Sequence, residues 1–223
     1  MPEIHDGSSV SSPGSLNPEA AHFDEIINGL ATRGFAITLD FLDQKAALLL
    51  AKETRQDWEE GESRRAGIGR GEELQVRDEI RRDHVRWLET EHVTGAQNLY
   101  LEKLATLRQA LNRQLFLGLQ RYEGHFAVYP PGAFYKAHLD RPRGSLDRWI
   151  TSILYLNPNW SEGDGGELKL QTEVGQREGK FLLVPPRLGT FVTFLAGDFW
   201  HEVLPSETDR LSITGWFCRS TDI

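Results

Sequence analysis

Residues 149–156, with the sequence WITSILYL, decide the fold class of this chain. The stretch is rich in β-branched and aromatic residues, which favour a strand, and the Asn-Pro pair at 157–158 is a turn signal that ends it. Thr151, Ile153 and Tyr155 alternate along the stretch, so their side chains share one face of the predicted strand. We therefore expect a sheet here, with the Tyr155 phenol on the same face as Thr151.

Short strand-like runs of the same kind fill the second half of the chain. Turn residues separate them, and they cover residues 125–129, 134–139, 167–171, 181–184, 190–195 and 211–218. In the first half, helices are predicted over 18–33, after the capping residue Asp43, and over about 97–120, with a short strand at 35–38. Helices first and many short strands later predict an α+β fold, a double-stranded β-helix (a jelly-roll or cupin-like barrel) buttressed on one face by N-terminal helices.

The chain divides into a tail, one domain and one long loop. Residues 1–16 are rich in Ser, Gly and Pro and have few large apolar groups, which predicts a flexible tail. Residues 17–223 have enough apolar content for one core and are interpreted as a single catalytic domain. Within it, residues 59–82 mix glycine with charge, and this segment, which includes Arg70, is predicted to be a mobile finger loop.

The composition narrows the class of partner and the compartment. A formal charge of -8 and a pI near 5.4 provide no general basic field for phosphate backbones, so no nucleic-acid partner is expected. No apolar run approaches the length of a membrane span, so no membrane association is expected. Cys218 is the only cysteine, and the chain therefore needs no oxidising compartment, which predicts a cytoplasmic location.

A metal site is suggested by residues beside two of the predicted strands. His138 and Asp140 lie two apart at the end of a strand-like run, so both side chains can reach one metal ion. His201 comes just before the last predicted strand and completes a set of two histidines and one carboxylate, which suits iron(II) oxygen chemistry. A His-x-Asp pair by itself is more often structural, and the same three residues also fit a zinc-dependent hydrolase.

The last predicted strand adds a basic group to this set. Arg210 opens the strand, and Arg210, Ser212, Thr214 and Trp216 share one face by alternation. A guanidinium in that place can hold a carboxylate through a bidentate pair, and the Tyr155 hydroxyl is placed to contact the same carboxylate. A zinc hydrolase has no obvious use for these groups. The pattern therefore predicts one pocket, with a metal at one end and a carboxylate clamp at the other.

These motifs resemble a known superfamily. HLD (138–140), a distant histidine in GDFWHEV (197–203) and RLSITGWF (210–217) look like the iron(II)/2-oxoglutarate-dependent oxygenases. The segments YPPGAFYKAHLD, ITSILYLNPNW, DGGELKL and DEIRRDHVRWLE narrow the resemblance to the prolyl 4-hydroxylases that modify proteins, including the hypoxia-sensing enzymes and their bacterial relatives. The agreement extends from about Phe35 to Phe217, so the single domain is interpreted as an oxygenase catalytic domain.

The resemblance implies a role for each matching residue of the pocket. By this matching, His138, Asp140 and His201 bind the iron, and Arg210 with Tyr155 holds the distal carboxylate of 2-oxoglutarate. These assignments agree with the metal site and the carboxylate clamp that strand alternation suggests.

Further residues are matched around the pocket. Tyr129 is implied to lie near the co-substrate, Thr214 to face the position of the iron-bound water or oxygen, and Trp216 to form part of the pocket wall. By the same matching, Asp83 and Arg148 are implied to be a pair that locks the finger over the substrate. The arginines of the finger favour a peptide or protein as that substrate.

The resemblance also implies the reaction. It is an iron(II)- and 2-oxoglutarate-dependent dioxygenation that uses O2, hydroxylates a prolyl residue in a protein and releases succinate and carbon dioxide, with ascorbate as a reductant. Elongation factor Tu is the protein partner suggested by the bacterial relatives. Two alternatives stay open: a hydroxylase of a small molecule or free amino acid, and a non-catalytic sensor that binds metal and 2-oxoglutarate.

Overall fold

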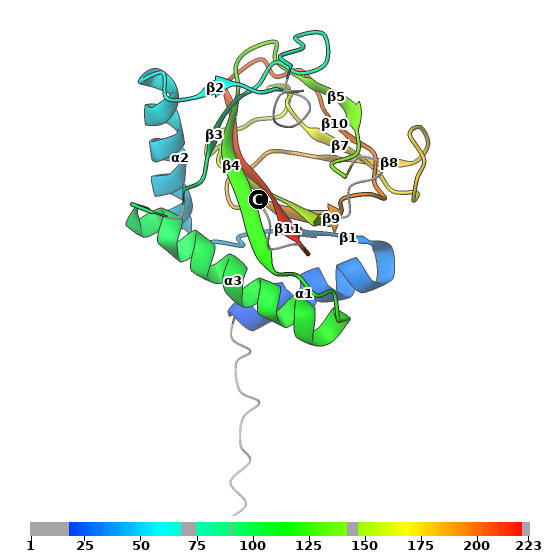
Figure 1. Ribbon diagram of the computed structural model, residues 1–223. Helices are drawn as coiled ribbons and strands as arrows, with labels where there is room; N and C mark the ends of the chain where they lie inside the picture. The colour runs from blue at the N-terminus through cyan, green and yellow to red at the C-terminus, as the bar shows by residue number, and fades with distance from the viewer. Residues whose placement is uncertain (1–17, 68–74, 90, 142–146, 220–223) are drawn as a thin grey trace, which may run out of the picture.

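Helices cover one face of the larger of two sheets in the computed structural model, which describes residues 18–67, 75–89, 91–141 and 147–219 (Figure 1). The predicted tail at 1–16 and Arg70 lie outside these ranges. Within them, every helix is too short or too polar to traverse a bilayer. The cytoplasmic location stays a prediction.

Three helices precede most of the strands, as the sequence indicates. They are α1 (Pro18–Arg33), α2 (Gln44–Glu59) and α3 (Gly95–Leu115). The Asp43 side chain caps α2 by accepting hydrogen bonds from the backbone N–H groups of Lys45 and Ala46, which confirms the predicted cap. The predicted end of the third helix near residue 120 is wrong, because Phe116 adopts a left-handed conformation with φ of 54° and the chain leaves the helix there.

Two antiparallel sheets face each other. The seven-stranded major sheet has the order β1 (Phe35–Thr38), β9 (Phe191–Leu195), β6 (Arg148–Tyr155), β11 (Arg210–Cys218), β4 (Arg121–Tyr129), β3 (His84–Trp87) and β2 (Arg64–Arg65). The four-stranded minor sheet has the order β5 (Tyr135–His138), β10 (His201–Val203), β7 (Leu168–Gln171) and β8 (Phe181–Val184). This arrangement confirms the predicted α+β fold with a double-stranded β-helix.

Apolar side chains on the two faces of the major sheet enter different cores. Ile150 and Leu154 of β6 pack toward the helices, in the same core as Phe41, whose ring stacks on that of Phe191 at 3.9 Å between centroids. Ile153, the residue next to Leu154 on the strand, packs in the core between the two sheets. Because neighbouring residues of a strand point to opposite faces, this alternation leaves the inner face of the major sheet free to carry a site.

The sequence does not predict three short strands, β2, β3 and β10. β10 has three residues and is held by pairing with β5 and β7, while β2 and β3 pair with each other in and beside the predicted finger. Residues 59–82 are therefore not purely a loop: α2 extends to Glu59, β2 lies within the segment, and Arg81 forms an isolated bridge with Tyr135. The mobility of this segment stays a prediction.

A buried amide fixes the start of β11. The Asn157 side-chain amide donates to the backbone carbonyls of Pro186 (2.7 Å) and Leu211 (3.0 Å), and its carbonyl accepts from the Leu211 N–H (2.7 Å). Buried polar groups that are fully paired in this way specify one local arrangement. The turn after β6 thereby sets the position of the neighbouring residue, Arg210.

Candidate active site

A cavity of about 820 Å³ lies between the two sheets and opens beside β2 and β3. Its walls include His138, Asp140 and His201 from the minor-sheet side and Arg210 and Thr214 from β11. The strands that the sequence places far apart, β5 and β11, thus contribute to one chamber. The structure therefore brings the predicted metal site and the predicted carboxylate clamp together.

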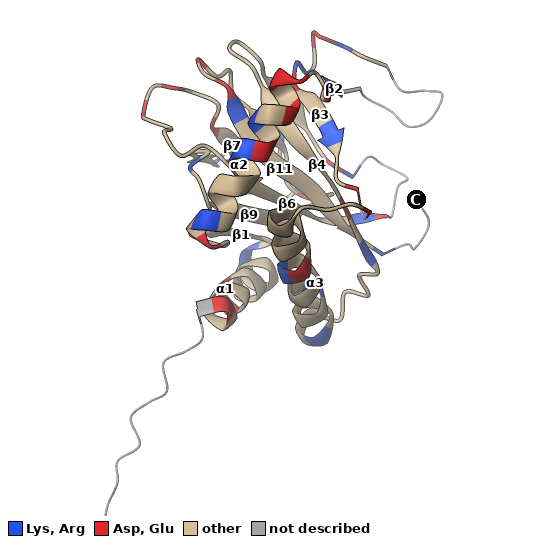
Figure 2. Cartoon of the chain, turned by 90° about the vertical axis from the view of Figure 1, so that its left-hand side faces the viewer, with Lys and Arg blue, Asp and Glu red and all other residues tan. Residues whose placement is uncertain are grey.

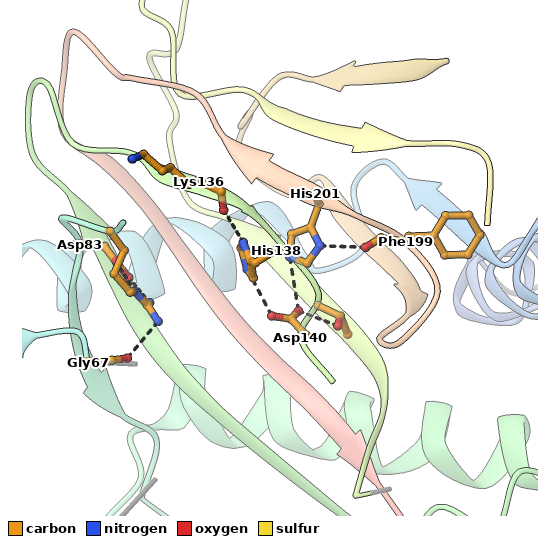
Figure 3. Close-up of polar contacts among 9 residues, drawn as sticks. Gly67, Asp83, Lys136, His138, Asp140, Phe199 and His201 are labelled. Carbon is orange, nitrogen blue, oxygen red and sulfur yellow. Dashed lines mark hydrogen bonds and ion pairs between the residues drawn. The ribbon is translucent and has the colours of Figure 1, made fainter. Parts of the chain in front are cut away.

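Two histidines and one aspartate converge on one point in this cavity. His138 and His201 are cross-strand partners on β5 and β10, and Asp140 follows two residues after His138 (Figure 3). Each histidine Nε2 lies 3.5 Å from an Asp140 carboxylate oxygen, His138 from Oδ1 and His201 from Oδ2. One ligand atom from each of the three residues lies within 4.8 Å of the others, which fits a single metal ion.

Hydrogen bonds to the backbone orient both imidazoles. The Nδ1 atom of His138 lies 2.8 Å from the carbonyl of Lys136, and that of His201 lies 3.1 Å from the carbonyl of Phe199 (Figure 3). A carbonyl only accepts, so each Nδ1 carries the proton and donates it. Each Nε2 lone pair is then free toward the shared point, as a metal ligand requires.

The charge states of the site suit a divalent cation. Burial favours the neutral form of Asp140, but the neighbouring imidazoles of His201 and His138 and the hydrogen bond from the Thr151 hydroxyl outweigh it and lower the carboxyl pKa. Burial and the nearby His138 lower the pKa of His201 to about 4. Asp140 is therefore ionised and His201 neutral at physiological pH, the forms in which these groups bind a metal.

Thr151 supports the carboxylate from the adjoining sheet. Its hydroxyl donates to Asp140 Oδ2 at 2.7 Å. The Thr151→Val substitution keeps the shape and removes this donor, so we expect metal affinity to fall by roughly tenfold or more, measured by calorimetric titration with manganese(II). Thr193→Val is the matched control, because Thr193 is equally buried and its hydroxyl has no partner among the described residues. Equal affinity of the two variants would contradict a role for Thr151.

At the other end of the cavity, Arg210 is almost fully buried at 2% exposure. Its Nε donates to the carbonyl of Gly166 (2.9 Å) and its Nη1 to the Ser212 hydroxyl (3.1 Å). The guanidinium also lies 4.8 Å from the ring centroid of Tyr129 and 4.9 Å from that of Tyr155. A buried guanidinium held this way has no carboxylate partner among the described residues, which leaves it available for an anionic ligand.

Two neighbours of Arg210 support this interpretation. The Tyr155 hydroxyl is buried without a hydrogen-bond partner in the described part of the chain, and burial raises its pKa, so it keeps a proton to donate. Gly166 has φ of 73°, and a Cβ there would lie 3.3 Å from the Arg210 side chain. Glycine therefore allows the backbone carbonyl to approach the guanidinium. The clamp fits one carboxylate of a small dicarboxylic acid.

Aromatic rings form the wall of the cavity beyond the metal set. His125 contacts Trp87 and Trp216, with ring centroids 5.1 and 5.5 Å away, and burial lowers the pKa of His125 to about 3. Trp216 and Thr214 line the cavity, as the sequence predicts for that face of β11. Tyr135 stacks on the His138 ring at 3.6 Å between centroids. The wall is mainly apolar, which helps to exclude water from the metal.

The predicted lid pair is not formed, because each member has another partner. Arg81 donates through Nε and Nη2 to the two Asp83 carboxylate oxygens (Figure 3). Arg148 donates to Glu123 at 2.7 Å and lies 3.5 Å from the ring centroid of Trp216. Asp83 and Arg148 are therefore paired with other residues in this structure, and their role as a lock over the substrate stays a prediction.

Several contributors to the site carried no clear signal in the sequence. No local pattern in the sequence indicates a role in the site for Gly166, Arg81 or Glu123. The alternation on 149–156 places Thr151 on the inner face, and this is the one signal that pointed toward its contact with Asp140. The partner of a side chain depends on distant strands, which local patterns do not reveal.

Known proteins agree with the fold and the site. Residues 124–218 match the family model of the 2OG-Fe(II) oxygenase superfamily. The chain is 40% identical to a Pseudomonas putida prolyl-4-hydroxylase, with a TM-score of 0.80 over 88% of this chain and 99% of that one. It is 25% identical, with a TM-score of 0.79 and 90% of each chain covered, to a Trichoplax adhaerens prolyl hydroxylase in complex with a hypoxia-inducible factor oxygen degradation domain peptide.

The same fold also occurs in a non-haem α-ketoglutarate-dependent carbocyclase from nogalamycin biosynthesis. That likeness has 13% identity and a TM-score of 0.63, covers 92% of this chain and 87% of the carbocyclase, and concerns the fold alone.

The double-stranded β-helix with two histidines and one aspartate in its cavity defines the class of mononuclear non-haem iron oxygenases. The chain belongs to the 2OG-Fe(II) oxygenase superfamily and, within it, to the prolyl 4-hydroxylase branch. It is a 2-oxoglutarate-dependent dioxygenase of the prolyl 4-hydroxylase type, and the family uses iron(II), 2-oxoglutarate and O2.

Proposed function

We propose that this enzyme hydroxylates a prolyl residue within a protein, with release of succinate and carbon dioxide. The observation that carries the proposal is that one cavity holds both the convergent His-Asp-His set and the buried clamp around Arg210, and opens to solvent beside β2 and β3. The 40% identical Pseudomonas putida relative is a prolyl-4-hydroxylase, and the Trichoplax adhaerens relative is in complex with a peptide. Both relatives support a peptidyl proline as substrate.

In this proposal His138, Asp140 and His201 hold the iron, which activates O2 and the co-substrate when it is bound. Arg210 and Tyr155 bind the far carboxylate of 2-oxoglutarate, and Ser212 and Gly166 hold the guanidinium in place. Fixing that carboxylate orients the 2-oxo acid end toward the metal set, which lowers the entropic part of the barrier.

The aromatic wall has a separate task. Tyr129 lies against Arg210, and Thr214 and Trp216 line the same cavity. In our proposal Tyr129 borders the co-substrate, and Thr214 and Trp216 face the open side of the metal. Their apolar surfaces exclude water and keep the reaction on the substrate C–H bond. We propose that the segment at 59–82, to which β2 belongs, covers the bound substrate.

Elongation factor Tu is our candidate partner, with ascorbate as the reductant that restores iron(II). Succinate formation should be measured with iron(II), ascorbate and 2-oxoglutarate, in the presence of elongation factor Tu, other proline-containing proteins, or free proline. We expect a protein to raise succinate formation by at least about tenfold over the uncoupled rate, because bound substrate completes the site. Stimulation by free proline and by no protein would instead support the small-molecule hydroxylase.

A further inference from the structure

Arg64, at the mouth of the cavity, has no carboxylate partner among the described residues. Five arginines line the cavity, and Arg64 on the edge strand β2 is the most peripheral of them in the sheet order. Four have a partner or a role: Arg65 pairs with Asp78 (3.0 Å), Arg81 with Asp83, Arg148 with Glu123 (2.7 Å), and Arg210 belongs to the carboxylate clamp. No carboxylate among the described residues pairs with Arg64.

The strand register places Arg64 on the substrate face of the sheet. Arg64 pairs with Val85, Val85 with Ala127, and Ala127 with Ser212. Cross-strand partners share a face, so Arg64 stands in the row that ends at the 2-oxoglutarate clamp. Arg65, the next residue on β2, also borders the cavity, but Asp78 neutralises it. Figure 2 shows β2 and β3 at the end of the molecule away from α1 and α3.

The charges deeper in the cavity cancel when the site is loaded. A divalent metal, the Asp140 carboxylate, a dicarboxylate co-substrate and the Arg210 guanidinium together sum to zero formal charge. The buried Asp83 carboxylate neutralises Arg81, and the partly buried Glu123 carboxylate neutralises Arg148. Among the described residues that line the cavity, Arg64 therefore leaves one positive charge at the mouth, in an enzyme whose formal charge is -8. Such a charge at the rim favours a negatively charged partner segment.

We propose that Arg64 selects protein substrates that carry an acidic side chain near the target proline, an inference that rests on the proposed function. Adjacent strands lie about 4.8 Å apart, so β2 lies roughly 14 Å from β11 across three spacings. The extended side chain of Arg64 covers part of the distance from β2 toward β11. Because an extended peptide advances about 3.3 Å per residue, the acidic residue lies about three to five positions from the proline.

Synthetic peptides test this directly. Each carries one proline in an alanine-rich background, with a single Asp, Asn or Lys placed one to six positions on either side. Binding is measured to the protein loaded with manganese(II) and 2-oxoglutarate, which reports affinity without turnover, and hydroxylation is measured with iron(II). We expect Asp at three to five positions to bind about fivefold tighter than Asn and Lys to bind more weakly still, with the difference shrinking as salt rises.

The variant Arg64→Glu should reverse this order, binding the Lys peptides better than the Asp peptides. Arg113→Glu is the matched control, because Arg113 is exposed in the last turn of α3, on the other side of the major sheet, and gives the same change in net charge. The control should keep the preference of the wild-type protein.

The outcomes separate the inference from the proposed function. Equal binding of Asp, Asn and Lys peptides, or an Asp preference that survives Arg64→Glu, overturns the role of Arg64 while prolyl hydroxylation stands. An Arg64-dependent Asp preference in binding, with no proline hydroxylated in any peptide or protein, supports the acidic-substrate site and overturns the proposed reaction.

Discussion

The His138→Ala variant is expected to lose succinate formation by about three orders of magnitude or more, together with tight metal binding. The substitution removes one of three ligands whose donor atoms lie within 4.8 Å of one another. It also leaves the ionised Asp140 with only one imidazole neighbour, so the remaining pair holds a divalent cation weakly. Metal affinity is measured by calorimetric titration with manganese(II), and turnover by succinate formation.

His125→Ala provides the matched control for this loss. His125 is a buried histidine that lines the same cavity as His138, but its ring contacts Trp87 and Trp216 and it is not in the convergent set. We expect this control to keep the manganese(II) affinity of the wild-type protein. Unchanged metal binding in His138→Ala, or equal losses in both variants, would show that the metal lies elsewhere.

The Arg210→Ala variant should raise the KM for 2-oxoglutarate by about a hundredfold, since charge-assisted hydrogen bonds to a buried carboxylate contribute roughly 2–3 kcal/mol. Arg210→Lys should recover part of the loss, because a lysine retains the charge without the planar pair of donors. The rise in KM is measured by succinate formation at saturating iron(II). Manganese(II) affinity without 2-oxoglutarate should stay close to the wild-type value.

A loss of folding is the competing explanation for Arg210→Ala, since the guanidinium also contacts Gly166 and Ser212. Thermal unfolding therefore accompanies the kinetics, with Arg113→Ala on the surface of α3 as the unperturbed arginine control. A folded Arg210→Ala enzyme with the wild-type KM would contradict the clamp.

The core strands could be predicted from the sequence because alternation and turn residues are local signals. Residues 149–156 and 211–218 each alternate between an inner and an outer face, and both are central strands of the major sheet. β10 could not be predicted in this way, since three residues become a strand only by pairing with β5 and β7. Its secondary structure is a product of the tertiary fold.

The leucine spacing that correctly predicts α3 continues beyond the end of the helix at Leu115. Leu115 and Leu119 continue the helical spacing of leucines, and Leu119 is buried at 2% exposure. The chain nevertheless turns at Phe116, and the Asn112 side chain bonds both the N–H and the carbonyl of Leu119. Leu119 therefore enters the core from a capping segment, which spacing alone does not distinguish from another helical turn.

The candidate site also contains residues that local alternation groups and contacts that depend on the tertiary fold. His138 and Asp140 share a strand end, and Arg210 and Ser212 share a strand face, so alternation was sufficient to group them. The partner of Asp83 in this structure is Arg81, which forms a two-pronged ion pair with it, and the sequence did not indicate this pair. Choosing between two arginines requires the three-dimensional arrangement of β3 and β6.

Isotopically labelled O2 tests the central proposal most directly. The enzyme, iron(II), ascorbate, 2-oxoglutarate and a protein substrate are incubated under labelled O2, and the products are analysed by mass spectrometry. We expect one labelled oxygen atom in a hydroxylated proline of the protein and the other in succinate, in equal amounts. A hydroxyl oxygen derived from water, or succinate formed without hydroxylation of a proline in any protein, would contradict the assignment of this chain as a protein prolyl hydroxylase.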